Sequence, residues 1–146
     1  MTARLIASLA LACSLGAALA QDRLAPSAFI VVDGDTIRSP AGIRYRLLGF
    51  DAPEIIHAQC DFEYALGMRA KGRLEDLIAG GNARLVESGK LDRYARTLAV
   101  LTINGRDVAE TLVQEGLAMR YFGRRRQSWC DDTAKPPKRL NPASKN

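Results

Sequence analysis

The sequence predicts an α+β fold, a small five-stranded barrel with two packed helices. Three observations predict it: short apolar strands separated by turn residues, two segments with helical apolar periodicity, and the order β-β-β-α-β-β-α along the chain. The chain has 146 residues. Residues 21–146 suffice for one domain with a single core, so no second domain is expected.

The first three strands are expected at residues 28–32, at 36–38 and at 43–50. An Asp-Gly pair at 33–34 separates the first two, and Ser39-Pro40-Ala41-Gly42 separates the next two. Apolar residues alternate with Arg44 and Arg46 along the third segment, as expected for a strand with two different faces. The three segments are therefore predicted to form a meander.

A long helix is predicted over Asp61–Ile78, with Asp61 as its N-cap and Gly80-Gly81 at its end. Its apolar stripe comprises Phe62, Ala65, Leu66, Met68, Ala70, Leu74, Leu77 and Ile78. Two more strands are expected at 83–87 and 94–103, followed by a tight turn at Asn104-Gly105. Asp107 is the predicted cap of a second helix, whose inward residues are Val108, Leu112, Val113 and Leu117.

The N-terminus has the pattern of an export signal. Arg4 precedes an uncharged apolar stretch, and Ala18-Leu19-Ala20 forms a small-x-small cleavage site. Lipidation at Cys13 is the alternative, because Leu11-Ala12-Cys13 is a partial lipobox. We expect residues 1–20 to be a signal peptide cleaved near Ala20. This predicts a periplasmic or secreted protein without a stable membrane anchor. The protein is also expected to be a monomer.

The mature chain is then expected to have three parts. A polar lead-in (21–27) precedes the domain (28–130), and a tail rich in proline, lysine and polar residues (131–146) is expected to lack stable structure. The formal net charge of +5 is compatible with a polyanionic partner, but many basic domains bind none.

Once Cys13 leaves with the signal, Cys60 and Cys130 remain as an even pair. Redox or metal chemistry is the alternative use of such a pair. In an exported chain, a separation of 70 residues favours a structural disulfide. That bond would tether the C-terminal segment to the start of the first helix.

Four carboxylates are predicted to meet at neighbouring strand ends: Asp33, Asp35, Asp51 and Glu54. An isolated Asp-Gly turn is usually structural. Here Asp33 and Asp35 point the same way, toward the end of the strand that carries Asp51, and carboxylates gathered so closely repel each other unless a cation joins them. Calcium suits such oxygen ligands. Zinc is disfavoured, because the only histidine, His57, is interpreted as a loop residue.

Two arginines accompany the acidic residues. Arg46 alone could shield the sheet, and Arg96 alone could belong to a solvated charged loop. Together with the carboxylates they supply planar donors for phosphate oxygens, which is the other half of a phosphoryl-transfer site.

The segments 31–37, 46–54 and 92–98 together resemble the signature of the staphylococcal-type thermonuclease family, calcium-dependent nucleases with an OB-fold. The resemblance runs from about Val31 to Tyr121. It implies endonucleolytic hydrolysis of DNA and RNA, in single-stranded or melted form, that leaves 3′-phosphate ends.

The resemblance also implies roles for the acidic side. Asp35 and Asp51 would coordinate Ca²⁺ directly, together with the backbone carbonyl of Ala52. Asp33 would support these ligands from behind. Glu54 would act as the general base on the attacking water.

On the phosphate side, the resemblance implies that Arg46 and Arg96 stabilise the developing charge and that Tyr94 reaches a neighbouring phosphate. Tyr121 and Phe122 follow the second helix and would either stack on bases or form an apolar lid. Arg124-Arg125-Arg126 would either follow a nucleic-acid backbone or form a solvated turn.

The sequence departs from the family pattern at several points. Ala52 stands where threonine is common, and Ala95 where glycine usually precedes the second arginine. The loop 55–59 is short, and the family's third helix has no counterpart. The disulfide and Trp129 are expected to cover the surface that this helix would protect. The alternative function is a nucleic-acid-binding OB-fold module without turnover, and a purely structural barrel is a weaker third option.

Overall fold

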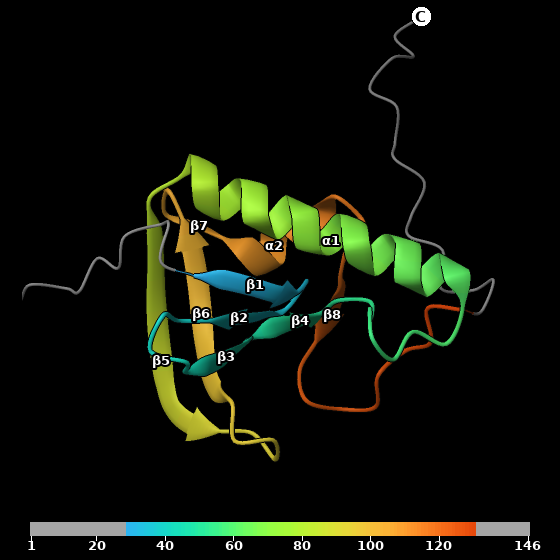
Figure 1. Ribbon diagram of the computed structural model, residues 1–146, viewed down its shortest axis with the longest axis horizontal. Coiled ribbons are helices and arrows are strands. Elements are labelled where there is room, and N and C mark those ends of the chain that lie inside the picture. The colour runs from blue at the N-terminus through green and yellow to red at the C-terminus, as the bar shows by residue number, and fades with distance from the viewer. Residues whose placement is uncertain (1–28, 131–146) are drawn as a thin grey trace, which may run out of the picture.

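The computed structural model describes residues 29–130, and Figure 1 shows their arrangement. The long helix α1 (Asp61–Gly80) lies along one side of a curved sheet, and the short helix α2 (Val108–Gln114) packs behind it. The predicted class is confirmed: two helices pack on a sheet whose main path has five strands, consistent with the OB-fold.

The main sheet has the strand order β1-β2-β3-β6-β5. Its strands are β1 (Ile30–Asp33), β2 (Thr36–Arg38), β3 (Arg44–Leu47), β5 (Ala83–Leu91) and β6 (Thr97–Ile103). The predicted meander of the first three strands is confirmed, with antiparallel pairing. β3 then pairs in parallel with β6, which brings Arg46 opposite Leu98, close to the loop that carries Arg96. Within residues 29–130, no pairing joins the two edge strands β1 and β5.

The segment predicted as one strand over 43–50 is divided in two. Gly49 has a φ of +91°, a backbone conformation that glycine adopts without strain, and the chain turns there out of the main sheet. The next strand, β4 (Gly49–Asp51), pairs instead with β8 (Met119–Tyr121). This break places Asp51 on a second small sheet beside the first.

Two glycines allow close packing around the turn between β1 and β2 and around the start of α1. A Cβ on Gly34 would lie 2.6 Å from the Cβ of Ala52 and 2.8 Å from the Cβ of Ala70. A Cβ on Gly67 would lie 2.8 Å from the carbonyl oxygen of Pro53. Larger residues at either position would push the acidic turns apart, so the Asp-Gly-Asp sequence has a packing reason as well as a turn preference.

The helix α1 begins differently from the prediction. Cys60 is the N-cap residue and provides no side-chain cap, while Asp61 is already helical, so the predicted Asp61 cap is wrong. Leu66, Ala70, Leu74 and Ile78 are buried as expected. Phe62 and Met68 are 48% and 45% exposed, which shows that the buried stripe is narrower than the apolar pattern. Gly80 is the last helical residue, and Gly81 follows in extended conformation.

The second half of the fold follows the prediction with shifted boundaries. β5 extends to Leu91, and β6 begins only at Thr97, so residues 92–96 form a loop rather than the start of a strand. Asn104 and Gly105 form the expected tight turn with positive φ angles, before β7 (Arg106–Asp107). Asp107 caps α2 as predicted, because its Oδ1 accepts a hydrogen bond of 2.8 Å from the Ala109 N–H.

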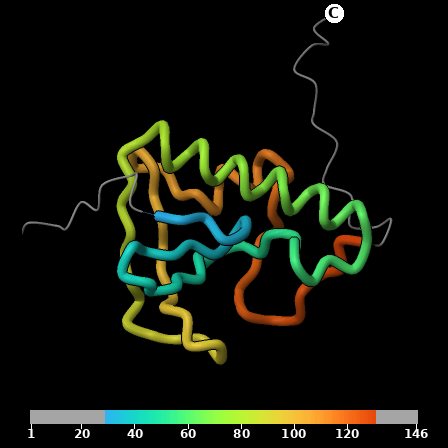
Figure 2. Tube along the Cα trace, viewed as in Figure 1, coloured from blue at the N-terminus to red at the C-terminus, as the bar shows by residue number. Residues whose placement is uncertain are grey.

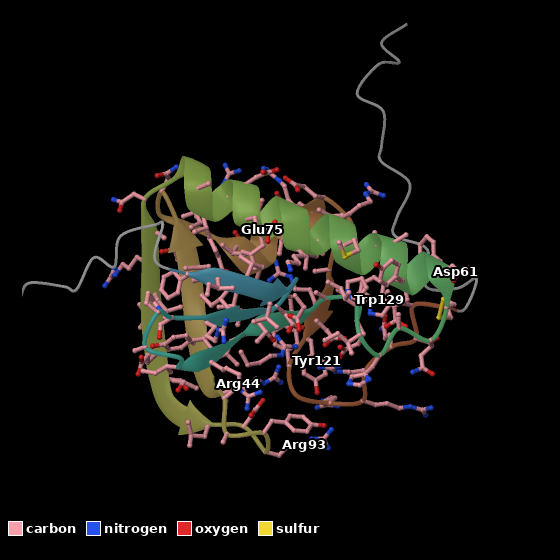
Figure 3. The ribbon with its side chains drawn as sticks, in the orientation of Figure 1. Arg44, Asp61, Glu75, Arg93, Tyr121 and Trp129 are labelled. Carbon is pink, nitrogen blue, oxygen red and sulfur yellow. A yellow bond between two sulfur atoms is a disulfide. The ribbon has the colours of Figure 1, made fainter. Side chains whose placement is uncertain are left out.

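The predicted disulfide between Cys60 and Cys130 is present, with a Cα–Cα distance of 6.0 Å. It brings the C-terminal end of the domain back to the start of α1, as the trace in Figure 2 shows. Trp129 is only 5% exposed and joins the core, and it lies on the inner side of α1 toward Asp61 (Figure 3). The segment before the disulfide therefore packs against the domain.

The predicted signal peptide (1–20), the lead-in (21–27) and the tail (131–146) lie outside the described residues. Among residues 29–130, no helix is long and apolar enough to cross a membrane.

Candidate active site

A buried arginine joins two buried aspartates at the centre of the site. Arg46 on β3, Asp35 in the turn after β1 and Asp51 at the end of β4 are each at most 6% exposed. Nη2 of Arg46 lies 2.9 Å from Oδ2 of Asp35 and 3.1 Å from Oδ1 of Asp51. Arg46 also donates to the carbonyl oxygens of Leu47 and Phe50, so its guanidinium is fixed by backbone as well as by charge. Arg46 is thus an internal site residue and does not shield the outer surface of the sheet.

Hydrogen bonds to the surrounding turn orient the carboxylate of Asp35. Its Oδ2 accepts from the Ala52 N–H at 3.1 Å, and its Oδ1 accepts from the Thr36 hydroxyl at 3.0 Å. Asp33 lies behind this carboxylate: Oδ1 of Asp33 accepts from the Asp35 N–H at 3.0 Å. Asp33 therefore holds the turn that presents Asp35.

The pKa values of both central aspartates are raised from 3.8 to about 6. For Asp35 the main cause is burial, which the charge of Arg46 opposes and the charge of Asp33 reinforces. For Asp51 it is again burial, opposed most strongly by Arg126 and reinforced by Asp35 and Glu54. The site therefore holds negative charge that a bound cation would stabilise.

The donor set suits a hard cation. The carboxylates of Asp35 and Asp51 lie close enough together to share Nη2 of Arg46 as a partner. Calcium accepts carboxylate, carbonyl and water oxygens in flexible geometry. Side chains alone do not complete such a site, because no group of three or more His, Cys, Asp or Glu residues within 29–130 could hold a metal ion. Further ligands would come from backbone carbonyls, such as that of Ala52, and from water.

Arg96 approaches the same centre from the loop between β5 and β6. Asp92 accepts hydrogen bonds from the Arg96 N–H at 3.0 Å and from Nε of Arg96 at 2.8 Å. Nη1 of Arg96 donates at 3.0 Å to the hydroxyl of Thr36, which in turn donates to Asp35. This chain of hydrogen bonds connects Arg96 to the buried carboxylates through Thr36, a residue that sequence reasoning did not select.

The loop that holds Arg96 is tightly constrained. Ala95 has a φ of +57°, which confirms that this position requires the left-handed conformation for which glycine is better suited. Burial raises the pKa of Asp92, but hydrogen bonds from Arg96 and Tyr94 outweigh this and hold the pKa below its usual value. Asp92 is thus an anion that orients Arg96.

Tyr94 lies on the exposed rim of this loop. It is 55% exposed, and its hydroxyl accepts a hydrogen bond of 2.6 Å from Arg93. The Cζ atoms of Arg93 and Arg96 lie 4.7 Å and 5.5 Å from its ring centroid. Arg44 and Arg93 both lie in the lower part of the view in Figure 3, and Arg44 donates to the Tyr94 carbonyl oxygen. The structure therefore places Tyr94 beside Arg96 within a basic rim, and its contact with a phosphate stays a prediction.

Glu54 has a partner that sequence reasoning did not assign. Its side chain is 35% exposed and pairs with Nη1 of Arg126, whose Nε lies 3.0 Å from Oδ1 of Asp51. Its backbone N–H donates at 3.3 Å to Oε1 of Glu63, a buried acid in the first turn of α1. Oε2 of Glu63 also accepts from the Gln59 N–H at 2.7 Å. Glu63 thus braces the short loop that carries Glu54.

A hollow of about 160 Å³ lies next to Asp51. Tyr121, Phe122, Arg124 and Arg125 contribute to its walls. Phe122 is 79% exposed, so its ring does not cover the core. His57 is an exposed residue of the loop before α1, as predicted.

Comparison with known proteins is consistent with this geometry. Residues 44–139 match the family described as staphylococcal nuclease homologue. That range covers most of the described domain and includes Arg46, Asp51, Glu54 and Arg96.

Several curated proteins are similar in sequence. A protein of Haemophilus influenzae named uncharacterized endonuclease is 36% identical over 95 residues, which are 62% of this chain and 49% of that protein. Endonuclease YncB of Bacillus subtilis is 35% identical over 95 residues, 60% of this chain and 43% of that protein. Protein ParB of Escherichia coli is 32% identical over 133 residues, 82% of this chain and 70% of that protein. The chain thus spans less than half the length of the two endonucleases.

Proposed function

Because the chain belongs to the staphylococcal nuclease homologue family, we propose that it is a calcium-dependent nuclease that hydrolyses phosphodiester bonds of DNA and RNA. The observation that carries the proposal is the convergence of Asp35 and Asp51 on Arg46, with Arg96 connected to the same centre through Thr36. The names of the similar endonucleases support the same class of reaction.

The acidic residues hold the cation and activate water. Asp35, Asp51 and the carbonyl of Ala52 are the proposed ligands, and Asp33 fixes the turn behind them. Calcium bound there would act as a Lewis acid on a phosphate oxygen and increase the acidity of water. Glu54 is the proposed general base. It is partly exposed and shares Arg126 with Asp51, so it lies near the proposed ligands and within reach of solvent.

The arginines bind the phosphate that gains charge during hydrolysis. Arg46 and Arg96 present planar donors, and preorganised donors of this kind stabilise developing charge most effectively where water is excluded. Backbone carbonyls of Leu47 and Phe50 fix the guanidinium of Arg46, and Asp92 holds that of Arg96, so both groups are held in place before the reaction.

The surface around the centre suits a single strand. Tyr94 lies beside Arg96 on one side, and the hollow with Tyr121 and Phe122 lies beside Asp51 on the other. Exposed aromatic rings near basic groups are typical of proteins that stack unpaired bases and follow the backbone. We therefore propose single-stranded or melted DNA and RNA as substrates, with products that carry 3′-phosphate ends.

A second candidate is a nucleic-acid-binding module without turnover. Ala95 at a φ of +57° favours it, because alanine is strained in this conformation and the same loop carries Arg96. Against it, buried carboxylates repel a polyanion, so the pair Asp35 and Asp51 has no use in binding alone.

Export is also part of the proposal. The disulfide between Cys60 and Cys130 is typical of oxidising compartments and supports a periplasmic or secreted location. Cell fractionation, together with N-terminal sequencing of the mature chain, would show Gln21 as the first residue. Recovery of the intact N-terminus in the cytoplasm would contradict it.

Cleavage of a labelled single-stranded DNA tests the activity. The oxidised protein is incubated with calcium, with magnesium or with EDTA, and the product ends are tested for removal of a 3′-phosphate by a phosphatase. The proposal predicts cleavage in calcium only, with phosphatase-sensitive 3′ ends. Tight binding without cleavage would support the binding module.

A further inference from the structure

A third arginine contacts the carboxylates of the site. Nε of Arg126 lies 3.0 Å from Oδ1 of Asp51, and Nη1 of Arg126 pairs with Oε1 of Glu54. The same Asp51 oxygen also receives Nη2 of Arg46. One carboxylate oxygen is therefore shared by two guanidiniums, of which that of Arg46 is buried and that of Arg126 is 41% exposed.

Arg126 lies in a segment that is anchored at both ends, by the pairing of β8 with β4 and by the disulfide at Cys130. The segment follows β8 and ends at Trp129, which is buried, and at Cys130, which is bonded to Cys60. Sγ of Cys130 also lies 3.8 Å from Oε2 of Glu63, the acid that braces the Glu54 loop. The disulfide therefore fixes Arg126 and Glu54 relative to the same end of α1.

The neighbouring arginines differ from Arg126. Arg124 and Arg125 line the hollow beside Asp51, and within residues 29–130 neither forms an ion pair. Only Arg126 of the three reaches the carboxylates that the proposed reaction uses.

We propose that Arg126 is a third phosphate-binding arginine of this site, which pairs with Asp51 and Glu54 until cation and substrate take its place there. This inference rests on the proposed function. A cation on Asp51 leaves the guanidinium of Arg126 without that partner, and its planar fork matches a phosphate as well as a carboxylate. Because its side chain is 41% exposed and its partner Asp51 lines the hollow, Arg126 can turn toward a bound nucleic-acid strand without unfolding its segment.

Removal of Arg126 should change the affinity for calcium and the affinity for a nucleic-acid strand in opposite directions. Without Arg126, calcium competes with one guanidinium fewer for Asp51, so calcium binding becomes tighter. Without Arg126, one phosphate contact is lost, so binding of a single strand becomes weaker and less sensitive to salt. A residue that only stabilised the fold would not produce this pair of effects.

The test uses the full exported chain in oxidised form, with Arg126→Gln, Arg126→Lys and Arg106→Gln. Arg106 on β7 is exposed and forms no ion pair within residues 29–130, so its substitution removes the same charge away from the site. Circular dichroism and thermal unfolding confirm that each variant folds. Calcium affinity is measured by calorimetry without nucleic acid, and we expect about tenfold tighter binding for Arg126→Gln but an unchanged value for Arg106→Gln.

Strand binding is measured at saturating calcium in an Arg96→Ala background, which keeps the oligonucleotide intact. We expect Arg126→Gln to bind about tenfold more weakly and to reduce the slope of log affinity against log salt by about 0.7. Arg126→Lys should keep most of the salt dependence of binding but lose affinity, because an ammonium lacks the planar paired donors of a guanidinium. Unchanged calcium affinity, or an unchanged salt slope, would overturn the inference.

Different measurements test the role of Arg126 and the proposed nuclease activity. If the unmodified chain binds calcium and strand but does not cleave, the nuclease proposal fails. If it cleaves normally and Arg126→Gln has wild-type calcium affinity and KM, only the role of Arg126 fails.

Discussion

Asp35 and Asp51 each direct one carboxylate oxygen at the same atom, Nη2 of Arg46, at distances of 2.9 and 3.1 Å. Asp35 lies in the turn between β1 and β2 of the main sheet, and Asp51 ends β4 of the second sheet. The break of the chain at Gly49 brings them together. Burial raises the pKa of both to about 6, although Arg46 lies between them; the charge of Asp33 adds to the effect at Asp35, and the charges of Asp35 and Glu54 add to it at Asp51. The two aspartates of this centre therefore take up protons at a pH well above the usual pKa of an aspartate.

The stability of the cation-free protein should therefore depend on pH. Between pH 3.8 and about 6 the folded chain keeps protons on Asp35 and Asp51 that the unfolded chain has lost. The contribution of the two acids is fully present below pH 3.8 and is lost as the pH rises through 6, and it amounts to up to about 3 kcal/mol for each acid. Urea unfolding in EDTA at pH 4.5 and 7.5 measures it. Asp51→Asn should show a smaller drop than the unmodified chain; an equal drop would contradict the assignment.

The disulfide between Cys60 and Cys130 closes a loop of 70 residues. Replacing both cysteines by serine should lower the free energy of unfolding by about 4 kcal/mol, because the unfolded chain regains the entropy of an open loop. Denaturant unfolding of the oxidised protein, the reduced protein and the double variant measures this effect. Equal thermal stability of oxidised and reduced protein would show that the bond does not hold the Trp129 segment in place.

Ala95→Gly should stabilise the protein. Ala95 has a φ of +57°, and glycine removes the clash of the Cβ there at some cost in chain entropy, for a net gain of up to about 1 kcal/mol. Ala41→Gly is the matched control, because Ala41 is exposed and not at positive φ, and it should be neutral or slightly destabilising. Chemical denaturation compares the two, and a loss of stability in Ala95→Gly would contradict the strain argument.

Asp92→Ala should reduce cleavage without unfolding the domain. Asp92 accepts three hydrogen bonds that hold Tyr94 and Arg96, so its removal frees the Arg96 guanidinium. A misplacement of about 1 Å can cost about a hundredfold in rate. Steady-state kinetics should show the loss mainly in kcat, with Asp92→Asn partly active and the exposed α1 variant Asp76→Ala unchanged. Wild-type kcat in Asp92→Ala would exclude this positioning role.

Local patterns predicted much of the fold. The turn at Asn104-Gly105 and the helix cap at Asp107 depend only on residues close in sequence, and both occur where they are predicted. The division of the strand at Gly49 escaped prediction because it depends on pairing with β8, some 70 residues later. Asp61 failed as a cap because the helix begins one residue earlier than its acidic pattern indicates.

The candidate site could be predicted from the sequence only for residues that lie close together along the chain. Asp35, Asp51 and Arg46 lie near one another in sequence and do converge. Glu63 looks like any acid in the first turn of a helix, and only its burial against the Glu54 loop distinguishes it. Arg126 belongs to a charge run, and the disulfide and Trp129, not the run itself, bring it to Asp51.

The most direct test of the account is the calcium-dependent cleavage rate of Glu54→Gln. Glu110→Gln is the control, because Glu110 lies on the exposed side of α2 and forms only a 3.7 Å contact with Arg120. At saturating calcium, the account predicts that Glu54→Gln cleaves a labelled single strand at least about a hundredfold more slowly, while Glu110→Gln cleaves at the wild-type rate. Equal rates for Glu54→Gln and wild type would contradict the proposed site.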